Sequence, residues 1–213
     1  MSGAESIDES ESENGGENEG VPGVARVEAF SDGVIAIIIT IMVLELKAPE
    51  GPGLVLLWRL WPVATAYALS YGYVGLYWAN HHRLFSHARR VTNGLVWWNL
   101  VLLFTLSLIP FSTAYLGAQH FSREATMVYL ASLLFPSIGY GPLQRIIRRT
   151  GAHGAGASRY HRRTLRKGTA AIALYLLGIA LAGLVSPWGG IACALAVAIL
   201  WFLPTSPLDR IFD

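Results

Sequence analysis

Charged residues are scarce in this sequence, and cysteine is almost absent. Asp, Glu, Lys and Arg together make up 14% of the 213 residues, whereas a soluble domain of this length carries about 25%. Hydrophobic residues make up 53% of the chain. So little charge cannot cover a water-facing surface, and the composition therefore excludes an ordinary soluble domain and favours a membrane protein.

The single cysteine, Cys193, lies inside an apolar run. One cysteine excludes a disulfide within the chain and a zinc cluster, so we interpret Cys193 as a small buried hydrophobic residue. The last three apolar stretches of the chain contain almost none of the convergent polar pairs that a membrane-embedded enzyme needs. We expect no enzymatic activity, no cofactor and no metal site.

The few charges are segregated along the chain. Residues 1–20 hold seven acids and no base, whereas residues 145–167 hold eight bases and no acid. The first segment is too poor in apolar residues to fold, and its acidic start does not fit a signal peptide. We predict a disordered acidic tail over residues 1–22, a membrane domain over 23–206 and a short C-terminal tail over 207–213.

Apolar stretches of the length of a spanning helix, about 20 residues, follow the acidic tail. They cover residues 27–46, 55–79, 95–117, 125–144, 168–186 and 188–204. Their apolar runs do not alternate with polar residues, as the strands of a membrane barrel do. We therefore predict an all-α membrane protein with six transmembrane helices. Pro62, Pro110 and Pro136 fall inside these stretches, where we expect them to kink the helices.

Lys and Arg are concentrated in the connections after the second and fourth stretches, including the loop that we predict over residues 145–167. Short cytoplasmic loops of membrane proteins are rich in these residues. We therefore expect a multi-pass protein of the cell membrane with both termini in the cytoplasm. The partners that we expect for the arginine-rich loop are membrane lipids and not nucleic acid.

The first stretch differs from the others because it combines polar residues with an apolar run. Asp32 lies inside the apolar boundary, where a carboxylate costs about 2.5–3.5 kcal/mol and needs a partner. We expect that partner on another helix, and the residues at a suitable depth include His81, His82 and Asn99. A purely structural role for this polar group remains open.

Further along the same stretch, the residues that share one helical face are Ile37, Thr40, Ile41 and Leu44. Their spacings of three, four and seven positions make them project together. An apolar stripe of this kind is usually a packing surface. The spacing alone therefore leaves open whether it lines a pore.

The segment Arg26-x-x-x-Phe30-Ser31-Asp32, which leads into this Ile-rich helix, resembles the signature of bacterial members of the transmembrane protein 175 family. These proteins are relatives of the endolysosomal potassium channel. The segment from Trp78 to Phe85, and Asn99 with the residues that follow it, resemble the second and third helices of the same family. The resemblance covers most of residues 24–204.

The resemblance implies a potassium-permeable cation channel in which four subunits surround one pore, without the re-entrant carbonyl filter of other potassium channels. It implies a hydrophobic constriction at Ile37, a ring of hydroxyl groups at Thr40, and further apolar rings at Ile41 and Leu44. The permeant species would be the potassium ion, and the partner of each subunit would be the other copies in a homotetramer.

The resemblance also implies that Arg26, Phe30, Ser31 and Asp32 form a structural motif that holds the pore helix to other helices. Its candidate partners are Trp78, His81, His82 and Asn99. The main alternative is a secondary transporter or proton-coupled carrier, with Asp32 as the coupling acid. Carriers often contain paired repeats, and we find none between residues 27–117 and 125–204.

Overall fold

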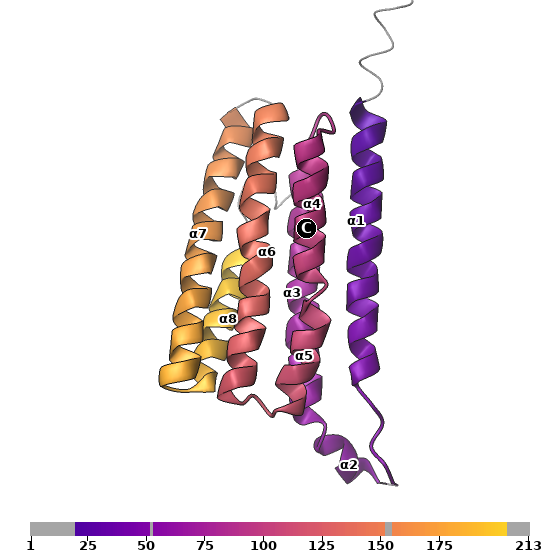
Figure 1. Ribbon diagram of the computed structural model, residues 1–213, viewed down its shortest axis with the longest axis vertical. Helices are drawn as coiled ribbons and strands as arrows, with labels where there is room; N and C mark the ends of the chain where they lie inside the picture. The colour runs from indigo at the N-terminus through magenta and orange to yellow at the C-terminus, as the bar shows by residue number, and fades with distance from the viewer. Residues whose placement is uncertain (1–19, 52, 152–154, 204–213) are drawn as a thin grey trace, which may run out of the picture.

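The computed structural model describes residues 20–51, 53–151 and 155–203, and the regular structure in these ranges is helical. The helices are α1 (Gly20–Met42) with the 3₁₀ turn η1 (Val43–Glu45), α2 (Leu54–Trp58), α3 (Trp61–Phe85), α4 (Asn93–Leu106), α5 (Ile109–Ala118), α6 (Arg123–Thr150), α7 (Ala155–Leu184) and α8 (Pro187–Phe202). The long helices form a bundle, and the short α2 lies beyond one end of it (Figure 1). The predicted acidic tail falls outside the described residues up to residue 19, as does the predicted C-terminal tail.

Three helical segments within the described residues are long and apolar enough to cross a membrane. They are Gly23–Glu45, Asn93–Ala118 and Arg159–Leu184. The apolar helix α8 has only 16 residues and is therefore about 24 Å long. Three of the six predicted spans thus meet the criteria of length and hydropathy, and the six-span plan stays a prediction.

Helices α3 and α6 are not among these three segments, and both carry polar side chains in the bundle interior. Ser70 of α3 donates a hydrogen bond to the Tyr129 hydroxyl of α6 at 3.1 Å, and Thr113 of α5 donates to Ser70 at 2.7 Å. The hydroxyls of Ser112 and Ser132 lie 2.6 Å apart. Polar groups bonded between helices need no water. These polar side chains lower the hydropathy of α3 and α6 without excluding the two helices from a membrane.

Two of the three prolines that we expected to kink helices begin them instead. Pro62 lies in the first turn of α3, and Pro110 lies in the first turn of α5. The missing N–H of proline has no cost at these positions. Pro110 thereby divides the third apolar stretch into α4 and α5, whereas Pro136 lies inside α6 as expected.

The arginine-rich loop predicted over residues 145–167 is mostly helical, which corrects that prediction. Helix α6 continues to Thr150, and α7 begins at Ala155. The prediction was wrong because hydropathy locates the edge of the membrane and not the end of a helix, and Arg is a good helix former. Arg148 and Arg149 lie in the last turn of α6, where positive charge interacts favourably with the helix dipole.

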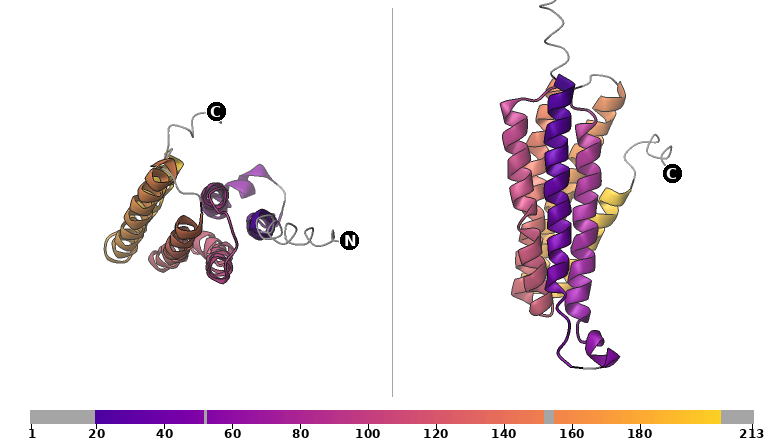
Figure 2. Two further views of the ribbon diagram at one scale, coloured as in Figure 1. Left: turned by 90° about the horizontal axis from the view of Figure 1, so that it is seen from above. Right: turned by 90° about the vertical axis from the view of Figure 1, so that its right-hand side faces the viewer.

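Helix α1 lies at one edge of the bundle (Figure 2). It packs against α3, α4 and α5. Its buried apolar side chains are Val24, Ile35, Ile38 and Met42, which lie on one helical face. The opposite face of α1 is exposed in the single chain.

The packing of α7 against α8 leaves no room for a side chain at Gly178, where a Cβ atom would lie 2.9 Å from the Cβ of Cys193. We predict that Gly178→Ala lowers the free energy of unfolding by about 1–3 kcal/mol through this clash. The matched control is Gly168→Ala on the same helix, because a Cβ there meets nothing within 4 Å. Thermal melting of the detergent-solubilised protein measures both, and equal melting temperatures would contradict the close packing.

Candidate functional site

A chain of buried hydrogen bonds joins α1 to α3 and α4. Asn99 of α4 donates from Nδ2 to the Ser31 Oγ atom of α1 at 2.8 Å, and its Oδ1 atom lies 2.9 Å from the His81 Nε2 atom of α3. Ser31 donates in turn to the carbonyl oxygen of Val27 at 2.8 Å. Because the amide oxygen of Asn99 can only accept, Nε2 of His81 carries the proton. The bonds therefore run in one direction, from His81 to the backbone of α1.

The three side chains that form these hydrogen bonds, Ser31, His81 and Asn99, are almost completely inaccessible to solvent. A buried polar group without a partner costs about 1–3 kcal/mol, so the hydrogen bonds favour one register of the three helices. The Phe85 ring stacks on the His81 imidazole with centroids 4.3 Å apart and holds it in place. The second ring nitrogen of His81, Nδ1, has no hydrogen-bond partner among the described residues.

Two more exposed contacts lie beside this chain. Trp78 of α3 donates from Nε1 to the Asp32 Oδ1 atom at 3.0 Å, and the His82 Nδ1 atom lies 2.8 Å from Oε1 of Glu28. Asp32, whose partner the sequence left open, thus contacts Trp78. We use the name polar anchor for the set Glu28, Ser31, Asp32, Trp78, His81, His82 and Asn99.

Arg26 and Phe30 lie apart from these hydrogen bonds. Both line an open groove of about 400 Å³ between α1 and α4. The Phe30 ring is exposed in the single chain. Of the four motif residues on α1, the structure therefore brings Ser31 and Asp32 into contact with α3 and α4 through hydrogen bonds, and it leaves Arg26 and Phe30 on the surface.

The stripe of Ile37, Thr40, Ile41 and Leu44 lies on the uncovered face of α1 and of the turn η1 that follows it. The exposed fractions of Ile37, Ile41 and Leu44 are 57%, 45% and 69%, and Thr40 is exposed as well. The Thr40 hydroxyl donates its proton to the Ile37 carbonyl oxygen at 3.0 Å. Its oxygen retains lone pairs that can accept a hydrogen bond or coordinate a cation.

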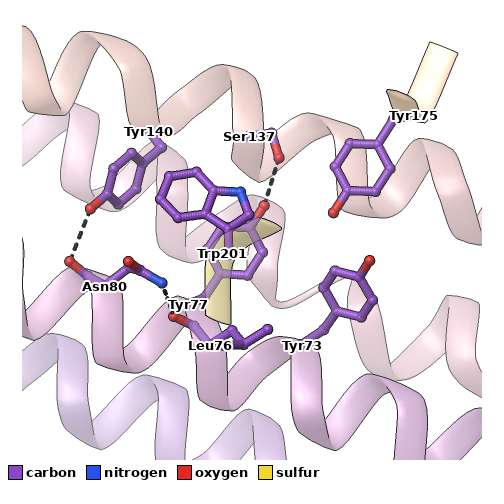
Figure 3. Close-up of a pocket in the computed structure, with 8 residues that line it drawn as sticks. All are labelled: Tyr73, Leu76, Tyr77, Asn80, Ser137, Tyr140, Tyr175 and Trp201. Atoms are coloured by element: carbon purple, nitrogen blue, oxygen red, sulfur yellow. Dashed lines mark hydrogen bonds between the residues drawn. The ribbon is translucent and has the colours of Figure 1, made fainter. Parts of the chain in front are cut away.

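A cluster of tyrosines elsewhere in the chain was not anticipated from the sequence. They line a cavity of about 20 Å³, and Figure 3 shows its lining residues: Tyr73, Leu76, Tyr77, Asn80, Ser137, Tyr140, Tyr175 and Trp201. Tyr77 and Ser137 hydroxyls lie 2.8 Å apart, and Tyr140 donates to the Asn80 carbonyl at 2.9 Å. The spacing of Tyr73, Tyr77 and Asn80 on one face of α3 was the available signal. The cavity has the size of one water molecule. It lies between α3, α6, α7 and α8.

The comparisons with known proteins bear on the same part of the chain. The sequence model of the family described as "Endosomal/lysosomal potassium channel TMEM175" matches residues 26–110, which include the polar anchor and the stripe. The chain is also 41% identical over 186 residues to a potassium channel of Chryseobacterium sp. (strain P1-3), covering 87% of this chain and 95% of that protein. The chain belongs to the TMEM175 family.

Other TMEM175 relatives extend this result to the fold. The crystal structure of a lysosomal potassium-selective channel TMEM175 homolog from Chamaesiphon minutus matches with a TM-score of 0.73 and 32% identity, covering 86% of this chain and 98% of that chain. A potassium channel of Streptomyces collinus is 37% identical over 134 residues, which is 59% of this chain and 65% of that protein. The resemblance drawn from the sequence is confirmed: this is an all-helical, multi-pass membrane protein of an ion-channel family and not an enzyme.

The polar anchor can be tested by removing its central amide. We predict that Asn99→Leu lowers the stability by about 1–3 kcal/mol, because it leaves Ser31 and His81 buried without their partner. The control is Asn93→Leu at the exposed start of the same helix, which should melt as the wild type does. Thermal unfolding followed by size-exclusion chromatography measures both. If Asn99→Leu melts at the wild-type temperature, the hydrogen-bond chain does not hold α1.

Proposed function

We propose that this protein is a potassium channel whose pore is lined by the exposed face of α1 from each of four subunits. Relatives that cover nearly the whole chain are potassium channels, which supports the activity. The stripe is the observation that supports a pore-lining role for α1. The rest of the chain leaves the stripe uncovered, and the polar anchor fixes the direction in which it faces. A single α1 cannot enclose a pore, so the proposal requires several copies of the chain.

In this proposal Ile37 forms the constriction. Isoleucine side chains that meet around an axis narrow the channel and can empty it of water, which closes it to ions. From Ile37 to Leu44 the pore wall is apolar except at Thr40, over a length of about 10 Å. A small rotation or splay of the α1 helices separates the Ile37 side chains and admits water.

Thr40 supplies the polar ring of this pore. Its hydroxyl proton is engaged by the Ile37 carbonyl, so four Thr40 oxygens remain to coordinate a partly dehydrated cation. Aliphatic side chains cannot replace an ion's hydration shell, and we therefore expect only modest discrimination between potassium and sodium.

The same proposal assigns an orientation in the cell membrane. The end of the bundle at which α1 begins also holds the end of α6 and the start of α7 (Figure 1), which are rich in arginine. Because short cytoplasmic segments are rich in Lys and Arg, we place this end in the cytoplasm, together with both termini. Arg26 and Phe30, which are exposed in the single chain, then lie at the cytoplasmic end of α1, where neighbouring subunits meet.

The constriction is tested by potassium flux into liposomes. We predict that Ile37→Asn raises passive flux several-fold, because a polar ring keeps the constriction hydrated. The control is Ile199→Asn on α8, a residue of the same type with a comparable exposed fraction of 61%, and it should conduct as the wild type does. Flux that requires a proton or sodium gradient and ignores Ile37 would contradict a channel and favour a carrier centred on Asp32.

The hydroxyl ring is tested by Thr40→Val, which keeps the shape of the side chain and removes its oxygen. We predict a lower ratio of potassium to sodium permeability, measured from the reversal potential with the two ions on opposite sides. The control is Thr169→Val on α7, where the hydroxyl donates to the Arg166 carbonyl in the same way as that of Thr40. If the ratio of potassium to sodium permeability is unchanged in Thr40→Val, the Thr40 hydroxyl does not contact the permeating ions.

A further inference from the structure

A wide basic pocket lies between α6 and α7, where α6 ends and α7 begins. It has a volume of about 670 Å³ and is lined by Gln144, Arg145, Arg148, Arg159, His161, Arg162 and Leu165. Four of these seven residues are arginines, and none is acidic. Helix α7 lies at the opposite edge of the bundle from α1 (Figures 1 and 2). The pocket is therefore separate from the proposed pore.

The spacing of the arginines along α6 and α7 places them on the helical faces that border the pocket. Arg145 and Arg148 are three positions apart on α6, as are Arg159 and Arg162 on α7, so each pair shares a helical face. The two helices pack directly against each other. A guanidinium group presents N–H donors in a planar fork that matches a phosphate group in two places. Two such pairs facing one pocket favour a phosphate-bearing anion over a simple carboxylate.

The inner wall of the pocket is made of buried polar side chains. Gln144 and His161 are each only 4% exposed, and Gln144 donates from Nε2 to the His161 carbonyl at 2.9 Å, which ties α6 to α7. The Nδ1 atom of His161 has no hydrogen-bond partner among the described residues. The His161 ring packs against the rings of His87 and Tyr160, with centroids 5.7 and 5.4 Å apart, and it therefore forms a fixed part of the pocket wall.

Exposed apolar side chains extend from the pocket along both helices. On α6, Ile138 and Phe135 lie seven and ten positions before Arg145 and share its helical face. On α7, Leu165 lines the pocket and Leu176 follows three turns later. All four apolar side chains are exposed. This apolar track suits acyl chains that descend from a headgroup held by the arginines.

We propose that the pocket between α6 and α7 binds the phosphate headgroup of an anionic phospholipid. Basic pockets between membrane helices on the cytoplasmic side are suited to such headgroups. A soluble phosphate shares the chemistry of the headgroup but makes no use of the apolar track, which is why we assign the lipid. Bound there, the lipid neutralises the arginines that crowd the ends of α6 and α7.

The test compares two double variants that remove the same charge. Arg148→Gln with Arg162→Gln removes two pocket arginines, whereas Arg149→Gln with Arg166→Gln removes two neighbouring exposed arginines outside the lining. Native mass spectrometry of the full chain in neutral detergent, titrated with phosphatidylglycerol, measures lipid binding. We expect the pocket variant to bind about tenfold more weakly and the control variant to bind as the wild type does. Phosphatidylcholine should bind weakly to all three.

Equal loss of binding in both double variants would overturn the pocket, because it would indicate a general effect of surface charge. A second titration uses inorganic phosphate: displacement of the lipid at comparable concentrations would assign the site to a soluble phosphate and overturn the lipid. Arg148→Lys with Arg162→Lys keeps the charge, and intermediate affinity there would show that the geometry of the arginines contributes. Ion flux is not measured, so failure here leaves the channel proposal untouched.

Discussion

The hydrogen bond from Asn99 to Ser31 connects the helix that carries the stripe to the rest of the chain. Apolar contacts also hold α1, through side chains such as Ile35 and Ile38. In a membrane such contacts have little hydrophobic driving force, and they tolerate rotation of the helix. A hydrogen bond between buried groups does not, because rotation would leave both groups without partners. The polar anchor therefore sets the rotation of α1, and with it the direction of Ile37 and Thr40.

The requirement to satisfy polar groups inside the membrane also explains the arrangement of the other helices. Helix α3 uses one face for both sets of contacts, because Ser70, Tyr77 and His81 are seven and four positions apart. His81 bonds to the anchor near the end of α3, and Ser70 and Tyr77 bond to interior hydroxyls of α5 and α6. Helix α3 thus links the anchor of α1 to the core of the bundle. The outer helices α1 and α7 leave most of their apolar side chains at least partly accessible, as segments that face lipid or neighbouring subunits would.

Much of this arrangement follows from the sequence, but only where composition or the spacing within one helix suffices to make the argument. The scarcity of charge predicts a helical membrane protein, the spacing of Ile37, Thr40, Ile41 and Leu44 predicts that they share a face, and the cost of a buried carboxylate predicts that Asp32 needs a partner. Which side chain meets Asp32 depends on how α1 and α3 pack. Spacing within one helix carries no information on that packing.

The errors have a similar origin. Hydropathy ended the fourth helix near residue 144 and so turned the arginines of 145–167 into a loop, although charged residues continue a helix beyond the membrane. The hydrogen bonds between α3 and α6 could not be predicted either, because hydropathy records Ser70 or Tyr129 as a loss of apolar character and not as half of a hydrogen bond. Pro110 was placed inside a helix because an apolar stretch does not reveal a break between α4 and α5.

In the proposed channel, the exposed face of α1 borders water and not lipid. The most direct measurement is the accessibility of Thr40→Cys, in a Cys193→Ala background, to a positively charged thiol reagent during potassium flux. We expect the reagent to modify this position and reduce flux, while Leu176→Cys, at an exposed position on α7, stays unmodified. If Thr40→Cys is as unreactive as Leu176→Cys, the stripe faces lipid and α1 does not line the pore.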